Sequence, residues 1–161
     1  MKRFLCLLGL AAVLGGCGDK IRERAERGDA EAQYNLALAY YKGEGVAKDL
    51  EEAVKWFSKS AEQGLAKAQY NLAVAYFKGL GVAKDLEEAV KWYRKAAEQG
   101  NAEAQNHLGG DLWHGSGGIA KDRPEAVKWF RKAAEQGDAT AQKGPASIKY
   151  GGAGIGVIES P

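Results

Sequence analysis

The chain has 161 residues and a nearly even charge balance, with 23 lysines and arginines against 21 aspartates and glutamates. No basic stripe stands out, which argues against a nucleic-acid partner. Its two cysteines, Cys6 and Cys17, both lie near the amino terminus, so a disulfide framework is excluded for the rest of the chain.

Residues 1–17 have the features of a lipoprotein signal peptide. A basic start is followed by an apolar run from Phe4 to Leu14, which is shorter than the ~20 residues that a membrane span needs. Residues 14–17, Leu-Gly-Gly-Cys, resemble a bacterial lipobox, which implies that Cys17 carries the lipid. Since Gly18 and not aspartate follows Cys17, the usual sorting rule predicts the outer membrane of a Gram-negative bacterium, on its periplasmic side. Ordinary secretion is the alternative.

Residues 18–27 look like the end of a helix whose beginning is missing. Ala25 lies 36 positions before Ala61, and Ile21 lies 36 positions before Phe57. The segment therefore repeats the apolar spacing of a helix further along the chain. We expect it to form an amino-terminal capping helix on the first repeat.

The centre of the chain is one block of 36 residues written three times. Residues 28–63, 64–99 and 100–136 are the copies, and the third gains one residue at Gly117 and Gly118. Repetition at this period indicates a solenoid. Apolar residues recur at helical spacing in each half of the block and predict two amphipathic helices per repeat, in the first copy through Ala32, Leu36, Ala39 and Tyr40, then Ala53, Trp56, Phe57 and Ala61.

The helix boundaries carry their own signals. An aspartate stands three residues before a glutamate at the start of each second helix, which predicts a reciprocal capping box, in the pairs Asp49 and Glu52, Asp85 and Glu88, and Asp122 and Glu125. Single glycines follow each second helix, where a left-handed residue usually closes it, at Gly64, Gly100 and Gly137. Glycine pairs mark the turn inside each hairpin, at Gly43 and Gly45, Gly79 and Gly81, and Gly115 and Gly117.

The repeated pattern Ala-x-x-x-Leu-(Ala/Gly)-x-x-Tyr-x-x-Gly-x-Gly-Val-x-x-Asp-x-x-x-Ala-x-x-Trp-(Phe/Tyr) resembles the Sel1-like repeat, a relative of the tetratricopeptide repeat with a longer interhelical loop. The resemblance covers residues 28–142. It implies an all-α fold, a right-handed α-solenoid of helical hairpins with a concave binding face. It also implies a scaffold or adaptor, since members of this family look like such proteins and bacterial members are often exported.

The largest recurring residues are interpreted as core. They fill the space between helices and between neighbouring repeats, through Trp56, Trp92 and Trp129, Leu36, Leu72 and Leu108, Tyr40 and Tyr76, and the small Ala53, Ala89 and Ala126.

The resemblance also implies which side chains face the concave surface. They form a ladder of aromatic and basic groups that is typical of a binding surface, consisting of Glu31, Tyr34, Leu38, Tyr41 and Lys42, then Lys67, Tyr70, Val74, Phe77 and Lys78, then Asn106, Trp113 and His114. Packing of these rings on the next repeat is the alternative interpretation.

The third repeat contains three potential metal ligands. His107, Asp111 and His114 stand at i, i+4 and i+7 of the expected helix, which would place three potential ligands on one face. A fourth ligand is lacking, so neither a metal site nor a cofactor is predicted. No nucleophile with a base or phosphate-binding loop emerges elsewhere in the sequence, and no catalytic residue is assigned.

Residues 137–161 begin a fourth repeat that then decays. Pro145 occupies the place of Leu36 and should break the helix. Four later residues keep the register of the first repeat, namely Tyr150, Gly152, Gly154 and Ile155, which align with Tyr41, Gly43, Gly45 and Val46. We expect a degenerate repeat with a weakly ordered tail from Lys143 to Pro161.

The sequence thus predicts a monomeric, non-enzymatic scaffold held in the bacterial envelope by a lipid on Cys17, which binds a protein or peptide through its concave face. Two alternatives remain open. One is an immunity protein that inhibits a toxin or lipase directed at the envelope. The other is an envelope enzyme that hydrolyses peptidoglycan or β-lactams.

Overall fold

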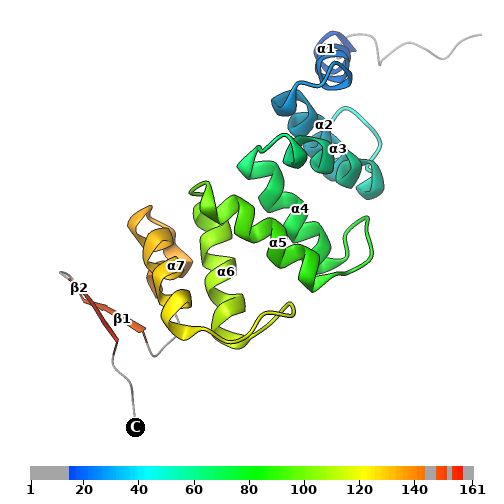
Figure 1. The fold of residues 1–161 in the computed structure, drawn as a ribbon. Helices are drawn as coiled ribbons and strands as arrows, with labels where there is room; N and C mark the ends of the chain where they lie inside the picture. Colours follow the sequence, from blue (N-terminus) through cyan, green and yellow to red (C-terminus); the bar gives the residue numbers. More distant parts are fainter. Residues whose placement is uncertain (1–14, 144–147, 152–153, 158–161) are drawn as a thin grey trace, which may run out of the picture.

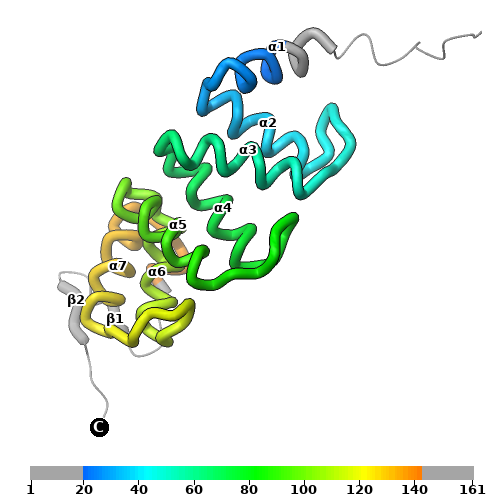
Figure 2. Tube along the Cα trace, turned by 45° about the vertical axis from the view of Figure 1, so that its right-hand side comes forward, coloured from blue at the N-terminus to red at the C-terminus, as the bar shows by residue number. Residues whose placement is uncertain are grey.

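The computed structural model describes residues 15–143, 148–151 and 154–157. The chain forms a row of antiparallel helical hairpins that step away from α1 (Figures 1 and 2). The helices are α1 (Gly15–Glu26), α2 (Ala30–Lys42), α3 (Leu50–Glu62), α4 (Ala66–Lys78), α5 (Leu86–Glu98), α6 (Ala102–His114), α7 (Arg123–Glu135) and α8 (Ala139–Lys143). The three predicted repeats are the pairs α2 and α3, α4 and α5, and α6 and α7, so the predicted all-α solenoid is confirmed.

Each second helix starts at the predicted aspartate. Asp49 accepts a hydrogen bond from the backbone N–H of Glu52 at 3.0 Å, and Asp85 accepts one from Glu88 at 3.0 Å. Asp122 does the same with Glu125 at 2.9 Å. The aspartate half of the predicted capping box is therefore confirmed in all three repeats.

The predicted hydrogen bond from each glutamate back to the N–H of the capping aspartate is not formed, so this half of the capping-box prediction is wrong. The backbone N–H of Asp49, which Glu52 was expected to bind, donates instead to the carbonyl of Tyr40 at 3.0 Å, and the equivalent N–H of Asp85 donates to Tyr76 at 3.0 Å. The loop brings a free carbonyl of the first helix to the start of the second, so the donor is satisfied within the hairpin. The carboxylate of Glu52 instead accepts a hydrogen bond from Nζ of Lys55 at 2.6 Å.

The predicted turn glycines adopt the left-handed conformation. Gly43 ends α2 with φ of 78° and Gly79 ends α4 with φ of 70°. Gly81 is needed for a second reason, because a Cβ there would lie 2.1 Å from the carbonyl oxygen of Leu50. The loop of the second repeat therefore rests directly on the first turn of α3.

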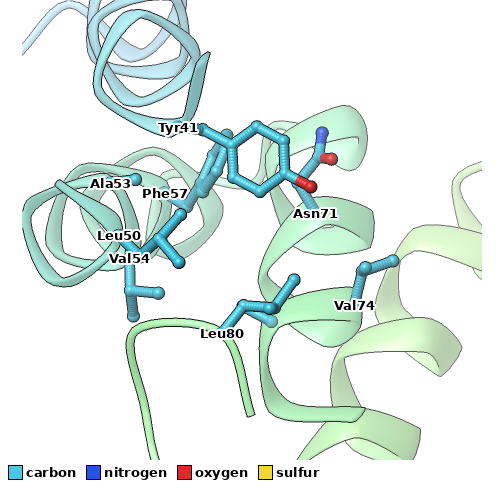
Figure 3. A pocket seen from close by; sticks show the side chains of 9 residues that line it. Tyr41, Leu50, Ala53, Val54, Phe57, Asn71, Val74 and Leu80 are labelled. Carbon is cyan, nitrogen blue, oxygen red and sulfur yellow. The ribbon is translucent and has the colours of Figure 1, made fainter. Parts of the chain in front are cut away.

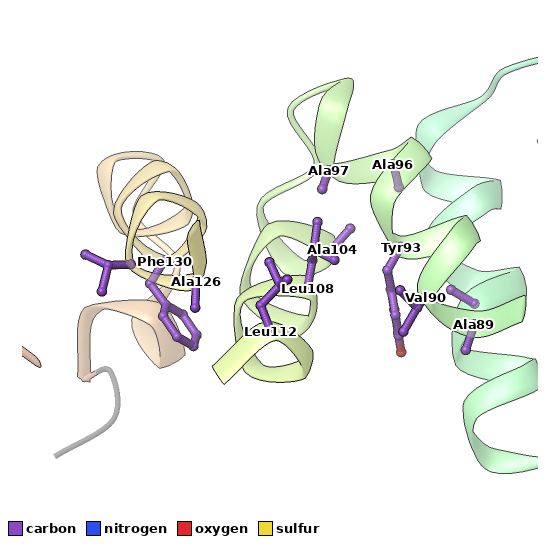
Figure 4. Packing of buried hydrophobic residues seen from close by; sticks show 12 residues of the cluster. Ala89, Val90, Tyr93, Ala96, Ala97, Ala104, Leu108, Leu112, Ala126 and Phe130 are labelled. Atoms are coloured by element: carbon purple, nitrogen blue, oxygen red, sulfur yellow. The ribbon is translucent and has the colours of Figure 1, made fainter. Parts of the chain in front are cut away.

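The deepest aromatic residues are those that follow the tryptophans. Phe57 is 3% exposed and Tyr93 is 1% exposed, whereas Trp92 and Trp129 are only partly buried. Trp56 is buried as predicted, but the expectation that all three tryptophans fill the core is wrong. Each indole lies at the edge of its helix, where a lysine one turn later covers it, as in Lys95, whose Nζ is 4.0 Å from the ring of Trp92. Figure 4 shows Tyr93, Leu108 and Phe130 among small alanines of α5, α6 and α7.

A buried glutamine joins each repeat to the helix before it. Gln69 donates to the carbonyl of Ala61 at 3.1 Å and accepts a hydrogen bond from Gln99 at 2.7 Å. The same arrangement recurs in the other repeats, through Gln33 with Ala25 and Gln63, and through Gln105 with Ala97 and Gln136. These bonds satisfy helix carbonyls at the edge of the solenoid where the short turns lie. Sequence analysis did not identify them.

The helix α1 packs on the first repeat. Ala25 of α1 is 1% exposed and belongs to the core of the first repeat, and Arg22 donates to the hydroxyl of Tyr40 at 2.8 Å. Residues 15–17 of the predicted signal peptide form the start of α1, while residues 1–14 lie outside the described part of the chain. Within the described residues, every helix is too short or too polar to cross a membrane.

The fourth repeat starts as predicted and then differs. Asp138 caps α8 by accepting a hydrogen bond from the N–H of Ala141 at 2.6 Å, but this helix has five residues where α2 has 13. The following segment pairs as two antiparallel strands, β1 (Ile148–Gly151) and β2 (Gly154–Val157). Tyr150, Gly154 and Ile155, which were aligned with the end of the first helix and the loop of the first repeat, thus lie in paired strands instead. Alternating glycine and β-branched residues in β2 favour a hairpin over a helix. Pro145 and Gly152 lie outside the described residues.

Candidate partner-binding surface

The predicted binding residues all lie on the first helix of a hairpin, α2, α4 or α6. Because these helices recur once per repeat, side chains at equivalent positions form rows that run across the repeats. The contacts between neighbouring rows decide which of these side chains are brought together.

Between α2 and α4 the structure joins three of the predicted residues. Lys67 Nζ lies 2.6 Å from a carboxylate oxygen of Glu31 and 4.7 Å from the ring centre of Tyr34. Asn71, which was not predicted, donates to the hydroxyl of Tyr34 at 3.4 Å and to the carbonyl of Lys67 at 3.0 Å. The first two repeats are thus linked by a mixed polar and aromatic cluster.

Between α4 and α6 the link is aromatic and depends on His107. Its ring stacks on Tyr93 with centroids 4.8 Å apart and planes 3° apart. It also lies 5.9 Å from Tyr70 and 6.4 Å from Phe77. Sequence analysis treated His107 only as a metal candidate, although its position 36 residues after Asn71 could have placed it in this row.

Several predicted binding rings also serve as packing. Tyr34 contacts Phe57 with centroids 5.9 Å apart, and Tyr70 contacts Tyr93 at 5.9 Å. Trp113 is partly buried, with the Arg123 guanidinium 5.2 Å from its ring centre. Tyr41 differs because 41% of its surface is exposed. Among the described residues it is the one large hydrophobic side chain that is exposed.

The remaining predicted residues border this row. Partly buried side chains are Leu38, Val74 and Asn106, and exposed ones are Lys42, Lys78 and His114. Lys42 lies 3.7 Å from Glu44. The surface therefore combines partly buried side chains with exposed polar and charged ones.

A pocket opens beside Tyr41 at the junction of the first two repeats (Figure 3). Its wall is mostly apolar, with Leu50, Val54 and Phe57 from α3 and Val74 from α4, and the polar side chain of Asn71 also lines it. The loop residue Leu80 closes its lower edge in the view of Figure 3, and the ring of Tyr41 stands over it.

The three candidate metal ligands do not form a metal site. Asp111 is 9% exposed and accepts a hydrogen bond from the hydroxyl of Ser116 at 2.5 Å. Burial raises the pKa of its carboxyl, and desolvation lowers the pKa of His107. In the part of the chain that the structure describes, His, Cys, Asp and Glu side chains nowhere gather in threes as a metal ion requires.

Comparison with known protein families identifies the repeats. The family model described as Sel1 repeat matches residues 30–65, 66–101 and 102–138, two residues out of step with the blocks read from the sequence. A sel1-like repeat-containing protein of Acanthamoeba polyphaga mimivirus is 40% identical over 42 residues, which is 26% of this chain and 7% of that protein.

Solved structures show the same architecture. A protective antigen of uropathogenic Escherichia coli with an SLR fold is 45% identical, with a TM-score of 0.74, over 76% of this chain and 26% of that one. A Sel1 repeat protein from Oxalobacter formigenes is 39% identical, with a TM-score of 0.73, over 78% of this chain and 93% of that one. Cysteine-rich protein B of Helicobacter pylori shares the fold, with a TM-score of 0.61 at 24% sequence identity. The match covers 79% of this chain and 96% of the H. pylori protein. The chain spans about a quarter of the E. coli antigen and a smaller part of the viral protein.

Proposed function

The chain belongs to the Sel1 repeat family, and we propose that it is a non-enzymatic scaffold of the bacterial cell envelope that binds a protein partner along α2, α4 and α6. Sel1-like repeat proteins are typically protein-interaction scaffolds, and the family is generally non-catalytic. The proposal adds a location and a binding face to that general role.

The observation that supports the binding face is the exposed ring of Tyr41 beside an apolar pocket. Tyrosine is one of the residue types enriched at the hot spots of protein interfaces. The neighbouring rows on α4 and α6 continue this surface with Phe77 and Trp113 at the positions equivalent to Tyr41. A partner that lies across the repeats would meet the exposed ring of Tyr41 and then the partly buried rings of Phe77 and Trp113.

The proposed location depends on the lipobox at residues 14–17. Lipid chains on Cys17 would hold the first repeat close to the bilayer, because Cys17 lies at the start of α1, which precedes the first repeat directly. On this proposal the partner is an envelope protein or a protein that enters the envelope.

In-cell photo-cross-linking tests the proposal. A photoreactive phenylalanine analogue is placed at Tyr41 of the full chain, and a matched variant carries it at Arg131, an exposed residue on α7. We expect a discrete cross-linked partner from position 41 and none from position 131. In the same strain, Cys17→Ala should abolish incorporation of labelled palmitate and move the protein out of the membrane fraction. Equal cross-linking from both positions would contradict the binding face, and unchanged labelling would contradict the anchor.

A further inference from the structure

The second junction between repeats carries a histidine where the first carries an asparagine. Equivalent positions of the three repeats, 36 residues apart, hold Asn35, Asn71 and His107. Histidine is the side chain whose ordinary pKa lies between pH 5 and 8. His107 therefore brings a group that changes charge near neutral pH into the packing between the second and third repeats.

The ring of His107 is part of an aromatic cluster that joins α6 to both helices of the second repeat. It lies flat on Tyr93 of α5, with centroids 4.8 Å apart and planes 3° apart. From α4, the rings of Tyr70 and Phe77 lie 5.9 Å and 6.4 Å away. Desolvation raises the pKa of both phenols, so Tyr70 and Tyr93 stay neutral when the histidine titrates.

His107 is held as a neutral imidazole but remains within reach of protons. Desolvation has the largest effect on its pKa and lowers it. The residue as a whole is nevertheless exposed, so a proton from solution reaches it without unfolding of the chain. Protonation in this position places a charge against three aromatic rings.

Charged groups of both signs surround the imidazole. Lys78 at the end of α4 opposes protonation, and Lys84 in the next loop lies over Phe77, with its Nζ 5.9 Å from the ring centroid. Carboxylates favour protonation and offset part of the desolvation, namely Asp111 and Glu103 of α6 and Asp138 before α8. The combined result is still a lowered pKa of His107.

Asp111 is a second group of this junction that titrates in the acidic range, but its effect has the opposite sign. Its carboxyl is buried and accepts a hydrogen bond from Ser116, and burial raises its pKa. Taking up a proton thus relieves a buried charge and stabilises the folded chain as the pH falls. The contribution of His107 is fully present above about pH 6.5 and is lost as the pH falls through its lowered pKa.

We propose that the contact between His107 and Tyr93 is an acid-sensitive joint, which holds the third repeat against the second at neutral pH and loosens when the imidazole takes up a proton. Asn71 does not titrate, so the first junction lacks this response. Acid would therefore loosen one end of the solenoid and leave the other packed. The inference is independent of the proposed scaffold function, because it concerns contacts within the chain.

Hydrogen exchange of the full chain tests the joint between about pH 7.5 and about pH 5.5, the range in which an imidazole changes charge. Rates are corrected for the intrinsic pH dependence of exchange. His107→Asn installs the residue of the first junction, and His114→Asn removes the other histidine as the matched control. Acid should reduce the protection of α6 in wild type and in His114→Asn, but not in His107→Asn, while α2 and α3 keep theirs in all three chains.

Proton NMR of the imidazoles provides a readout that a merely structural role of His107 would not move. The signals that persist in His114→Asn should titrate with a midpoint below the ~6.5 of an unperturbed imidazole. Ring signals of Tyr70 and Tyr93 should shift with the same midpoint. Asp111→Asn keeps an acceptor for Ser116 and removes the carboxylate that favours protonation, so its acid response should persist and begin at a lower pH.

The inference is overturned if α6 of His107→Asn loses protection in acid as wild type does. A midpoint at or above 6.5 overturns it as well, because the face of Tyr93 would then stabilise the imidazolium and acid would tighten the contact. Loss of the acid response in Asp111→Asn would assign that response to the carboxyl instead. Circular dichroism establishes that each variant is folded, and the imidazole titration of the wild-type chain decides the point if His107→Asn is not.

Discussion

At position 93 the second repeat carries a hydroxyl where the other two repeats have phenylalanine, Phe57 and Phe130. The hydroxyl of Tyr93 is buried and has no hydrogen-bond partner among the described residues. Burial also raises the pKa of this phenol, so it stays protonated and its donor goes unused. A buried polar group without a partner destabilises a fold.

We therefore predict that Tyr93→Phe raises the free energy of unfolding by about 1 kcal/mol, measured by urea denaturation. Tyr40→Phe is the control, because the hydroxyl of Tyr40 accepts a hydrogen bond from Arg22 and its removal should lower stability slightly. A loss of stability in Tyr93→Phe would mean that the hydroxyl has a partner, such as an ordered water.

At the scale of single elements, the helix starts depend on one side chain each. Asp85 caps α5 alone, since Glu88 contacts Lys91 at 2.9 Å and not the backbone of Asp85. The sequence pattern of a capping box fits both arrangements. Only the carbonyl of Tyr76, which the loop brings to the N–H of Asp85, decides between them.

Asp85→Ala should cost about 1 kcal/mol of stability, whereas Glu88→Ala should change it little, because an exposed ion pair contributes little. Chemical denaturation of the two variants in one buffer gives the comparison. Equal losses would mean that Glu88 takes part in the cap in solution.

At the scale of the whole molecule, the repeats are coupled through close backbone contacts. Gly81 of the second repeat rests on the backbone of Leu50 in the first, while the equivalent Gly45 of the first repeat has nothing within 4 Å of the position of its missing Cβ. Both glycines have positive φ, 71° and 75° respectively. They differ only in whether a neighbouring repeat lies against them.

Gly45→Ala should therefore cost about 1 kcal/mol, from backbone strain alone. Gly81→Ala should cost an additional 1 to 3 kcal/mol or so, because the loop must move off α3. Urea denaturation followed by both circular dichroism and tryptophan fluorescence provides the measurement. Similar costs for the two substitutions would show that this loop does not couple the repeats.

The sequence predicted the period, the hairpins, the aspartate caps and the turn glycines, because each depends on a local pattern that recurs three times. It did not predict which of Trp92 and Tyr93 is more deeply buried, since both occupy apolar positions of α5 and their burial depends on neighbouring helices. The role of His107 also depends on another element, the ring of Tyr93 on α5. The strands β1 and β2 were missed because a single copy of a decayed repeat carries no periodic signal.

The glutamine bonds are the same at three successive junctions of this solenoid. Gln33, Gln69 and Gln105 each bind the preceding helix in the same way, at distances between 3.0 and 3.1 Å. Each repeat thus carries the same glutamine contact at its start and offers the same carbonyl acceptor at its end. Unequal recombination between the nearly identical coding segments of the first two repeats could lengthen or shorten the protein in one step, so that the reach of the molecule changes without a new interface having to evolve.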